Sequence, residues 1–424
     1  MDDVSRQGFL SRRGFLKAGA AGATLASLPA CGATELGRTP LAAPIGVDDS
    51  SWAHVRARFM LEPGLAYMNN ASLGMPPTEV VKAVCDGYEA ISREPLQGKN
   101  DLQVIITNQV LPRLAAYFGA DVGELSLTRN ATEGLHLQAM GLELNPGDEV
   151  IITTQEHPAG NMPWALRKVR HGIKVTEVFI PSPFESGEQV VALMEAAITS
   201  RTKAISFCHA TRGGHLYPVR ELSRMARRHG VMSLVDGAQA IGQIPVDLSD
   251  LECDAYSASL HKWILGPAGT GFMYVRKGAR DQIKSSFSDQ SLIDSPSLGP
   301  GGTADFPVRA ALSTAIDFCN ALGAEKIEHR CRYLSDYLKV GLLGIDGVNI
   351  LSGSTPQISC PGSTIFEKMD LDAIKAVSLF EERIGTHIDE HQRDGHNAIR
   401  VSTHVYNTTA EIDRFLEVLS EARA

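Results

Sequence analysis

The chain has 424 residues, 43% of them hydrophobic and 21% charged, so it can form a large domain plus a smaller one and is not globally disordered. Its formal net charge of −9 argues against a nucleic-acid-binding surface, because phosphate binding requires a basic face. Beyond the N-terminal segment there is no apolar run of the roughly 18 residues that a membrane span requires.

Residues 1–31 are predicted to be an export signal. The stretch Ser11–Lys17 (SRRGFLK) resembles the twin-arginine export consensus, and the apolar run Ala18–Leu28 that follows is too short to span a bilayer. This resemblance implies that the twin-arginine translocase carries the folded protein to the periplasm or beyond. The sequence Leu-Pro-Ala-Cys ending at Cys31 also resembles a lipobox, which would anchor the protein through a lipid; ordinary cleavage after a small residue is the alternative. Residues 32–50 have the composition of a linker.

The folded body is expected to begin near Trp52 with an N-terminal arm over residues 51–75. Within it, the sequence LAYMNNASLG predicts a short strand that breaks into a polar turn around Asn70, which is also what a simple Asn-rich turn would look like. The next segment, residues 78–92, predicts a helix, because two prolines precede it and Thr78 can cap it.

From Glu124 onward, strands and helices alternate as in an α/β domain. The apolar runs predict strands at residues 125–127, 149–153, 203–207, 231–235 and 270–276. The loop 128–134 (TRNATEG) opens a helix with apolar residues at 135, 139 and 142, and a helix N-terminus is a natural seat for a phosphate, although an N-cap without a ligand has the same pattern. The strand at 149–153 ends in Gln-Glu-His157-Pro-Ala, and the strand at 203–207 leads to a loop, 208–215, whose two histidines have no assigned role.

Two charged residues follow neighbouring apolar runs. Asp236 closes the run 231–235, and Lys262 stands between the strand-like segment 257–260 and a glycine-rich loop at 266–271. In open α/β sheets, ligands bind beyond the carboxyl ends of the strands, so Asp236 and Lys262 are expected at the same edge.

The C-terminal part of the chain begins after a glycine turn that contains Thr303. A long amphipathic helix is predicted from Val308 through Arg330 and leads into the C-terminal domain. A later strand at residues 398–408 carries Arg400, which alternates with apolar neighbours and therefore points to the opposite face from them. A closing helix is expected over residues 410–419.

In order and spacing, these motifs resemble the class V aminotransferases, which are fold-type I enzymes using pyridoxal 5′-phosphate (PLP), and in particular the isopenicillin N epimerase-like subgroup. The motifs cover roughly residues 60–415. The resemblance implies an α/β fold with a large PLP-binding domain (residues 76–307), built on a mostly parallel sheet, and a smaller α+β domain (residues 308–424). It also implies a homodimer.

The same resemblance implies a role for each motif residue. Lys262 would form the aldimine and act as the general base at the substrate Cα, Asp236 would pair with the ring nitrogen, and His157 would lie over the ring. The remaining residues expected at the cofactor or substrate are the phosphate ligands Ala131, Thr132, Ser259 and His261, the phenolic-oxygen ligand Gln239, the substrate-side residue Asn70, the α-carboxylate ligand Arg400, and Thr303 from the partner subunit. A surface salt bridge is the alternative for Arg400.

The proposed chemistry sets requirements on these side chains. A lysine must be neutral to act as a nucleophile, and its ordinary pKa is about 10.4, so burial and nearby positive charge are expected to lower the pKa of Lys262. Asp236 is expected to keep the ring nitrogen protonated, so that the ring can accept the electrons of a carbanion at Cα.

The motifs do not separate transamination, epimerisation and β-elimination on an amino acid or an amino-acid-derived, peptidic amine. Cysteine desulfurase activity is less expected, because it needs a mobile cysteine shortly before Arg400 and the segment 381–399 has none. The seven cysteines, Cys360 among them, are scattered without metal-ligand spacing and are mostly expected to be buried thiols. A binding protein that kept the fold without PLP is the alternative from a different class.

Overall fold

The computed structural model describes residue 41 and residues 43–287 and 298–422. The predicted export signal, including Cys31, and most of the linker lie outside these residues. None of the helices in the described ranges is both long and apolar enough to cross a membrane.

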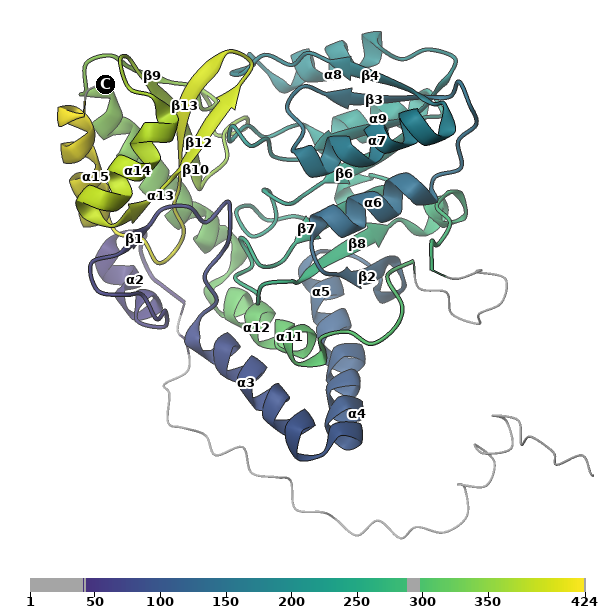
Figure 1. Ribbon diagram of the computed structural model, residues 1–424, viewed down its shortest axis with the longest axis horizontal. Helices are drawn as coiled ribbons and strands as arrows, with labels where there is room; N and C mark the ends of the chain where they lie inside the picture. Colours follow the sequence, from purple (N-terminus) through teal and green to yellow (C-terminus); the bar gives the residue numbers. More distant parts are fainter. Residues whose placement is uncertain (1–40, 42, 288–297, 423–424) are drawn as a thin grey trace, which may run out of the picture. The chain divides into compact units, whose positions relative to one another are not determined.

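A seven-stranded sheet forms the centre of the large domain (Figure 1), with strand order β2-β8-β7-β6-β5-β3-β4. Its strands are β2 (Leu125–Thr128), β3 (Glu149–Thr153), β4 (Lys174–Val178), β5 (Thr202–Cys208), β6 (Met232–Asp236), β7 (Ala255–Ser259) and β8 (Gly271–Val275). The sheet is parallel from β7 through β4, and β8 runs antiparallel to its two neighbours, β2 and β7. The strands predicted from the apolar runs are confirmed to within one residue at each end.

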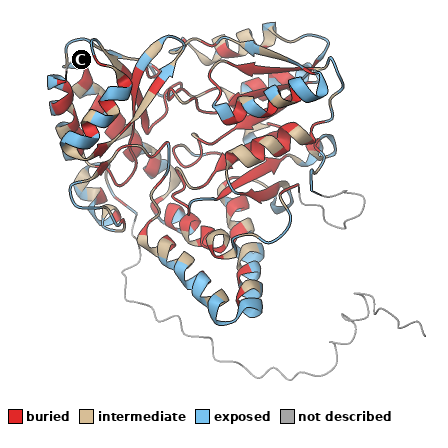
Figure 2. Cartoon of the chain, in the orientation of Figure 1, coloured by how far each residue is buried: buried red, intermediate tan, exposed pale blue. Residues whose placement is uncertain are grey.

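Both faces of this sheet are covered. Val150 and Ile152 of β3 pack in a cluster with Trp164, whereas Ile151 packs in another cluster with Leu222. Successive side chains of a strand point to opposite faces, so each cluster belongs to one face, and Figure 2 shows the strands buried beneath helices with exposed outer sides. The covering helices are α6 (Ala131–Gly141), α7 (Pro158–His171), α8 (Gly187–Ala196), α9 (Val219–Arg228) and the short α10 (Leu248–Leu251).

The N-terminal helices precede the sheet. They are α2 (Asp49–Arg56), α3 (Thr78–Arg93), α4 (Pro95–Ile105) and α5 (Leu111–Tyr117), with one π-helical turn (Ile106–Val110) joining α4 to α5; short 3-10 turns lie at Val122–Glu124 and Lys277–Gln282. The prediction that Thr78 caps α3 is wrong: Pro77 is the N-cap, and the Thr78 hydroxyl donates to Arg58 O at 2.6 Å. A proline at this position leaves the first amides of the helix without a side-chain acceptor.

The prediction of one long helix from Val308 through Arg330 is also wrong. The chain forms α11 (Phe306–Ala310), α12 (Leu312–Leu322) and α13 (Ala324–Leu343) instead. Gly323 ends α12 with φ of 87°, a conformation that glycine adopts without steric cost. The break lets α12 pack on α3 and α5 of the large domain, while α13 packs on strands of the C-terminal domain.

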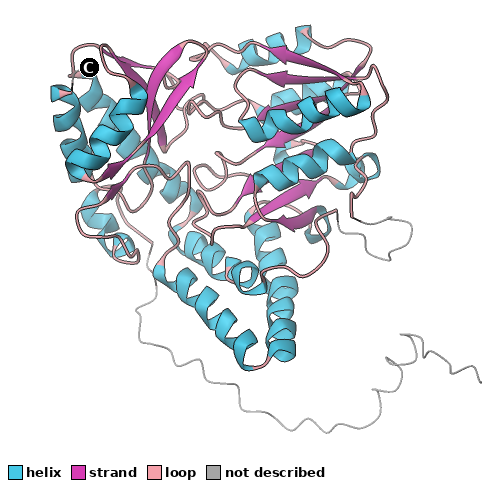
Figure 3. Cartoon of the chain, viewed as in Figure 1, coloured by secondary structure: helices cyan, strands magenta, loops and turns pink. Residues whose placement is uncertain are grey.

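The C-terminal domain contains a four-stranded antiparallel sheet in the order β12-β13-β10-β9, drawn in magenta beside its helices in Figure 3. Its elements are β9 (Val348–Ile350), β10 (Ser363–Lys368), α14 (Ala373–Ile384), β12 (Asp389–Arg393), β13 (His396–Ser402) and α15 (Thr409–Glu421). A separate two-stranded pair joins β1 (Ala66–Tyr67) to β11 (Thr386–His387). Ile399 and Val401 pack in the domain core, so Arg400 between them faces away from that core.

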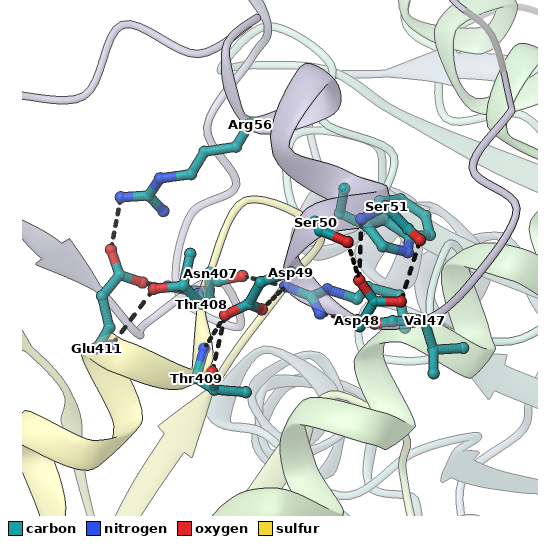
Figure 4. A network of polar contacts seen from close by, with 12 residues as sticks. Val47, Asp48, Asp49, Ser50, Ser51, Arg56, Asn407, Thr408, Thr409 and Glu411 are labelled. Atoms are coloured by element: carbon teal, nitrogen blue, oxygen red, sulfur yellow. Dashed lines mark hydrogen bonds and ion pairs between the residues drawn. The ribbon is translucent and has the colours of Figure 1, made fainter.

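A polar network ties the N-terminal arm to the C-terminal domain (Figure 4). The fully buried guanidinium of Arg330 donates to Asp49 Oδ1 at 2.7 Å and to Asn407 O at 2.6 Å. Asp49 also accepts from the hydroxyl of Thr409 at 2.8 Å, and Asn407 donates to Tyr67 O at 2.9 Å. The network therefore holds β1, and with it the turn that contains Asn70, against the end of β13.

Candidate active site

A cavity of about 460 Å³ lies at the carboxyl ends of the large-domain strands. Its lining residues come from the segments that follow β2, β3, β5, β6 and β7. They are Ala131, Thr132, Gln155, His157, Ala159, Cys208, Ala210, Arg212, Asp236, Ala238, Gln239, Ser259 and Lys262. The structure thus brings seven of the predicted site residues to one cavity.

Lys262 lies in the loop after β7, where the turn at Gly74 meets its backbone. Gly74 N donates to His261 O at 2.8 Å, and a Cβ at residue 74 would stand 1.8 Å from Lys262 O. Burial lowers the pKa of Lys262 to about 8, Asp236 opposes this shift, and Arg400 and Arg212 add to it. The expectation that burial and nearby positive charge favour the neutral amine agrees with this geometry.

Asp236 is the last residue of β6 and is buried. The parallel register places it beside Cys208 of β5 and Ser257 of β7, and its Oδ1 accepts from Ala238 N at 2.9 Å. Burial raises the pKa of Asp236, while the Ala238 amide and the charge of Lys262 lower it. A carboxylate in this position is stabilised by a cationic partner, and Lys262 supplies part of that charge.

The N-terminus of α6 also lines the cavity. The sheet register sets Thr128, Gly271 and Ser259 side by side, and Ala131 N donates to Ser259 Oγ at 2.9 Å. Asn130 caps the helix by accepting from Glu133 N at 2.9 Å. The positive end of the helix dipole suits a phosphate group here, although Ser259 Oγ already accepts from the Ala131 amide.

Two predicted ligands already have protein partners. His261 contacts Thr270 O through Nδ1 at 2.9 Å and is not among the cavity-lining residues. Gln239 lines the cavity, but its amide donates to Ala71 O and accepts from Trp263 Nε1, both at 2.9 Å. The proposed contacts of His261 with phosphate and of Gln239 with the phenolic oxygen stay predictions.

His157 is the N-cap residue of α7, at the exposed rim of the cavity. Its Nδ1 accepts from Ala159 N at 3.1 Å, which requires a ring nitrogen without a proton. Partial burial, together with the positive charges of Lys262 and Arg212, lowers the pKa of His157 to about 4. The ring is therefore neutral near pH 7, with its proton on Nε2.

Neither Asn70 nor Thr303 is among the residues that line the Lys262 cavity. Asn70 is buried, with Nδ2 3.4 Å from Lys262 O and Oδ1 accepting from Tyr406 Oη at 2.8 Å. Asn70 therefore contacts the backbone of Lys262.

Thr303 lines a different cavity, of about 1030 Å³, together with Arg129 and Arg309. Within the described part of a single chain, Thr303 is not brought to Lys262.

Arg400 is buried, which contradicts the alternative of a surface salt bridge. Its partner is Asp389, which stands directly opposite it in the β12–β13 register. Asp389 and its neighbour Arg212, which lies 3.3 Å from Asp389 Oδ2, were not predicted as site residues. The Asp394–Gly395 turn that joins the two strands has positive φ at both residues, and an Asp-Gly pair is a strong hairpin signal that could have revealed this register.

Glu156, next to His157 in the chain, was also missed as an ionisable group of the site. It is buried, and its Oε1 accepts from the Thr153 hydroxyl at 2.6 Å and from Cys208 N at 3.2 Å. Burial raises the pKa of Glu156 to about 8, and the charge of Asp236 adds to the shift. The group is therefore mostly protonated at neutral pH.

Comparison with known proteins finds one matching family and several relatives that share most of the chain. The family model described as Aminotransferase class-V matches residues 66–415. Isopenicillin N epimerase of Amycolatopsis lactamdurans is 29% identical over 402 residues, covering 88% of this chain and 98% of the relative. A cysteine desulfurase of Haloferax volcanii is 28% identical over 387 residues, covering 85% and 89% of the two chains.

Solved structures share the fold. A mutant of C-DES with glycine covalently linked to its PLP cofactor superposes with a TM-score of 0.78 at 25% identity, covering 86% of this chain and 99% of the other. C-DES in complex with cysteine persulfide, described as a cystine C–S lyase with its reaction product, gives a TM-score of 0.77 at 25% identity, covering 84% and 98%.

Proposed function

Because the chain belongs to the class V aminotransferase family, whose cofactor is PLP, we propose that it acts at the Cα of an amino acid or an amino-acid-derived, peptidic amine, as an aminotransferase or an epimerase. The observation that carries the proposal is that a half-buried lysine, Lys262, and a buried carboxylate, Asp236, line one cavity at the carboxyl edge of the sheet and shift each other's pKa.

The residues that line the cavity fit PLP. Lys262 has a lowered pKa, Asp236 lies at the carboxyl end of β6, and the N-terminus of α6 brings Ala131 and Thr132 to the cavity, where the helix dipole would favour a phosphate. When bound, PLP supplies an electron sink that stabilises negative charge at the substrate Cα. Asp236 would hold a proton on the ring nitrogen, and the neutral ring of His157 would cover the cofactor from the rim.

Lys262 would move the proton at Cα. A pKa of about 8 leaves a useful fraction of the amine neutral near pH 7, and a base works best when its pKa is close to the working pH. Arg400, on the C-terminal domain, would bind the substrate carboxylate, because a guanidinium fork matches a carboxylate in geometry.

The cysteines favour aminotransferase or epimerase chemistry over cysteine desulfurase chemistry. Cys208 lines the cavity but is buried, and burial raises its pKa well above the usual range. Cys360 is buried as well, with its pKa raised to about 12. A thiol acts as a nucleophile only as thiolate, and neither residue provides one. The segment 386–402, where β11 to β13 lie, contains no cysteine.

β-Elimination from a cystine-like substrate is the second candidate. It is favoured by the likeness to the cystine C–S lyase C-DES, and it requires the same abstraction of the Cα proton by Lys262. The products separate the candidates: a keto acid marks transamination, racemised substrate with solvent deuterium at Cα marks epimerisation, and pyruvate with a released sulfur compound marks elimination.

The first test is the visible absorbance of the purified full chain supplied with PLP. We expect a yellow protein in which borohydride fixes the cofactor to Lys262. The Lys262→Ala variant should fold but fix no cofactor. The control variant Lys326→Ala, which changes an exposed lysine, should behave as wild type. A protein that never takes up PLP would instead support a binding protein that kept only the fold. A panel of amino acids and short peptides in deuterated buffer then identifies the reaction.

A further inference from the structure

Asp389 lies between two arginines that come from different domains. Arg400 pairs with it across the β12–β13 hairpin, and Arg212, in the loop after β5, places Nη2 3.3 Å from Asp389 Oδ2. Arg212 Nη2 also donates to Glu390 O at 2.7 Å and to Glu390 Oε1 at 2.9 Å. One carboxylate is thus shared by the two guanidinium groups.

Neither guanidinium group has its full set of partners. The hydrogen bonds of Arg212 and of Arg400 all pass through Nη2, and the Nε atom of each arginine is buried without an acceptor. A carboxylate normally binds a guanidinium with two parallel hydrogen bonds, and a buried donor without an acceptor is costly. The pair of arginines can therefore bind more acceptor oxygens than Asp389 gives it.

The two arginines belong to the surroundings of Lys262. Arg212 lines the same cavity as Lys262, and the positive charges of Arg400 and Arg212 both lower the pKa of the lysine. Of the two arginines, Arg212 lines the cavity, and Asp389 links Arg212 to Arg400.

We propose that Arg212 and Arg400 together form a binding site for one carboxylate group of the substrate, and that Asp389 competes with this carboxylate for the same two guanidinium groups. The inference rests on the proposed function, because it assumes that the substrate carboxylate lies near Lys262. It adds Arg212 as a second carboxylate-binding arginine and Asp389 as a residue that determines specificity.

The charges around Asp389 explain why it would determine specificity. Asp389 and Glu390 already balance the charges of Arg212 and Arg400, so a further anion gains little net attraction unless it takes the place of one of these carboxylates. Only a group that can accept from both arginines replaces Asp389 without leaving further buried donors unpaired. The site therefore selects amines that carry a carboxylate and rejects simple amines.

Acetate is a suitable probe because it carries a carboxylate and no amine. We would titrate the full chain, supplied with PLP, with ¹³C-labelled acetate at constant ionic strength and measure its dissociation constant by NMR. Compared with wild type, Asp389→Asn is expected to bind acetate about tenfold more tightly, and Arg212→Gln is expected to bind it about tenfold more weakly. A tenfold change in the dissociation constant is about the scale of one hydrogen bond to a charged group. Arg212→Lys keeps the charge but loses the fork, and should fall between wild type and Arg212→Gln.

Two further variants separate the proposal from a general charge effect. Glu390→Gln removes a negative charge beside Arg212 alone, so its gain in affinity should be clearly smaller than that of Asp389→Asn. Glu328→Gln breaks an arginine pair of similar exposure in α13 and should match wild type. Equal gains for Asp389→Asn and Glu390→Gln, an unchanged Asp389→Asn, or an Arg212→Gln that binds acetate normally would each overturn the proposal. The visible PLP band is recorded in parallel, so that failure of the proposed function is seen independently of acetate binding.

Discussion

The ionisable side chains at the carboxyl edge of the sheet are driven toward their neutral forms by burial. The pKa of Lys262 falls to about 8 and that of Glu156 rises to about 8, because the charged form of each loses its hydration. Asp236, near both, experiences attraction from the lysine and repulsion from Glu156 when that residue is ionised. A protonated Glu156 therefore favours an ionised Asp236, the state that a ring-nitrogen partner requires.

Glu156→Gln is expected to reduce the pH dependence of stability. The folded pKa of Glu156, about 8, lies above the ordinary 4.5, so the folded state holds an extra proton between these values and stability falls as pH rises through this window. Glutamine keeps the acceptor for Thr153 and Cys208 and does not titrate. The variant should match wild type near pH 5 and be more stable near pH 8 by on the order of 2 kcal/mol, measured by urea unfolding.

The exposed residue Glu417 provides the control for that measurement, since Glu417→Gln should follow wild type at both pH values. A Glu156→Gln protein that loses stability at pH 8 would show that the carboxylate, rather than the acid, is the native form.

At the same scale, the sequence indicated that some residues would meet in the cavity and gave no sign of others. Asp236 and Ser259 end strands β6 and β7, Lys262 follows β7 closely, and the ends of adjacent strands must meet at one edge. Arg212 and Asp389 meet across two domains, and no periodicity relates a loop after β5 to a hairpin near the C-terminus. Such contacts depend on how the domains pack, which local patterns do not encode.

At the scale of elements, the turn before α3 and the loop after β7 fit together through a glycine. A Cβ at residue 74 would stand 1.8 Å from Lys262 O and 2.7 Å from Lys262 C, both backbone atoms that cannot move aside separately. Gly74→Ala should therefore cost roughly 3 kcal/mol of stability and displace Lys262, reducing the cofactor fixed by borohydride. Thermal unfolding and borohydride labelling measure the two effects.

Gly123 is a matched control, because a Cβ there meets no atom within 4 Å. Gly123→Ala should keep both stability and labelling. A Gly74→Ala variant indistinguishable from it would mean that the turn has room to shift away from Lys262.

Elements were predictable where a local signal is strong. Five strands were found to within one residue, because buried β-strands are short apolar runs between turn residues. The helix predicted from Val308 through Arg330 failed because its apolar pattern continues across Gly323, and only packing decides that α12 and α13 separate there. Strand β9 has only three residues and β12 has no apolar residue, so neither gives a readable apolar run and both were missed.

At the scale of the whole molecule, export is the first proposal to test. Because Ser11–Lys17 resembles the twin-arginine export consensus, we propose that the protein leaves the cytoplasm through the twin-arginine translocase. Replacing both Arg12 and Arg13 by lysine should leave PLP-loaded protein in the cytoplasm, measured by fractionation and immunoblotting. Arg6→Lys, outside the motif, serves as the control and should be exported normally. Unchanged export of the double variant would show that another signal directs the protein.

Dimerisation is the second proposal at this scale, and Thr303 gives it a sharp test. Thr303 lines its own cavity with Arg129 and Arg309, separate from Lys262, so we propose that it binds the PLP phosphate of a partner subunit. Thr303→Ala should then weaken PLP binding by roughly tenfold, the scale of a hydrogen bond to a charged group, measured as cofactor fixed by borohydride at limiting PLP.

Mixing two defective variants decides whether Thr303 acts across an interface. In a dimer of one Lys262→Ala chain and one Thr303→Ala chain, the intact Thr303 of the first would serve the intact Lys262 of the second. Random re-association makes half of the dimers mixed, so about a quarter of all sites should recover wild-type affinity for PLP. If Thr303 acted within its own chain, every site would still lack Lys262 or Thr303, and mixing would restore none. A recovery near zero, with native mass spectrometry that confirms mixed dimers, would therefore contradict a shared site.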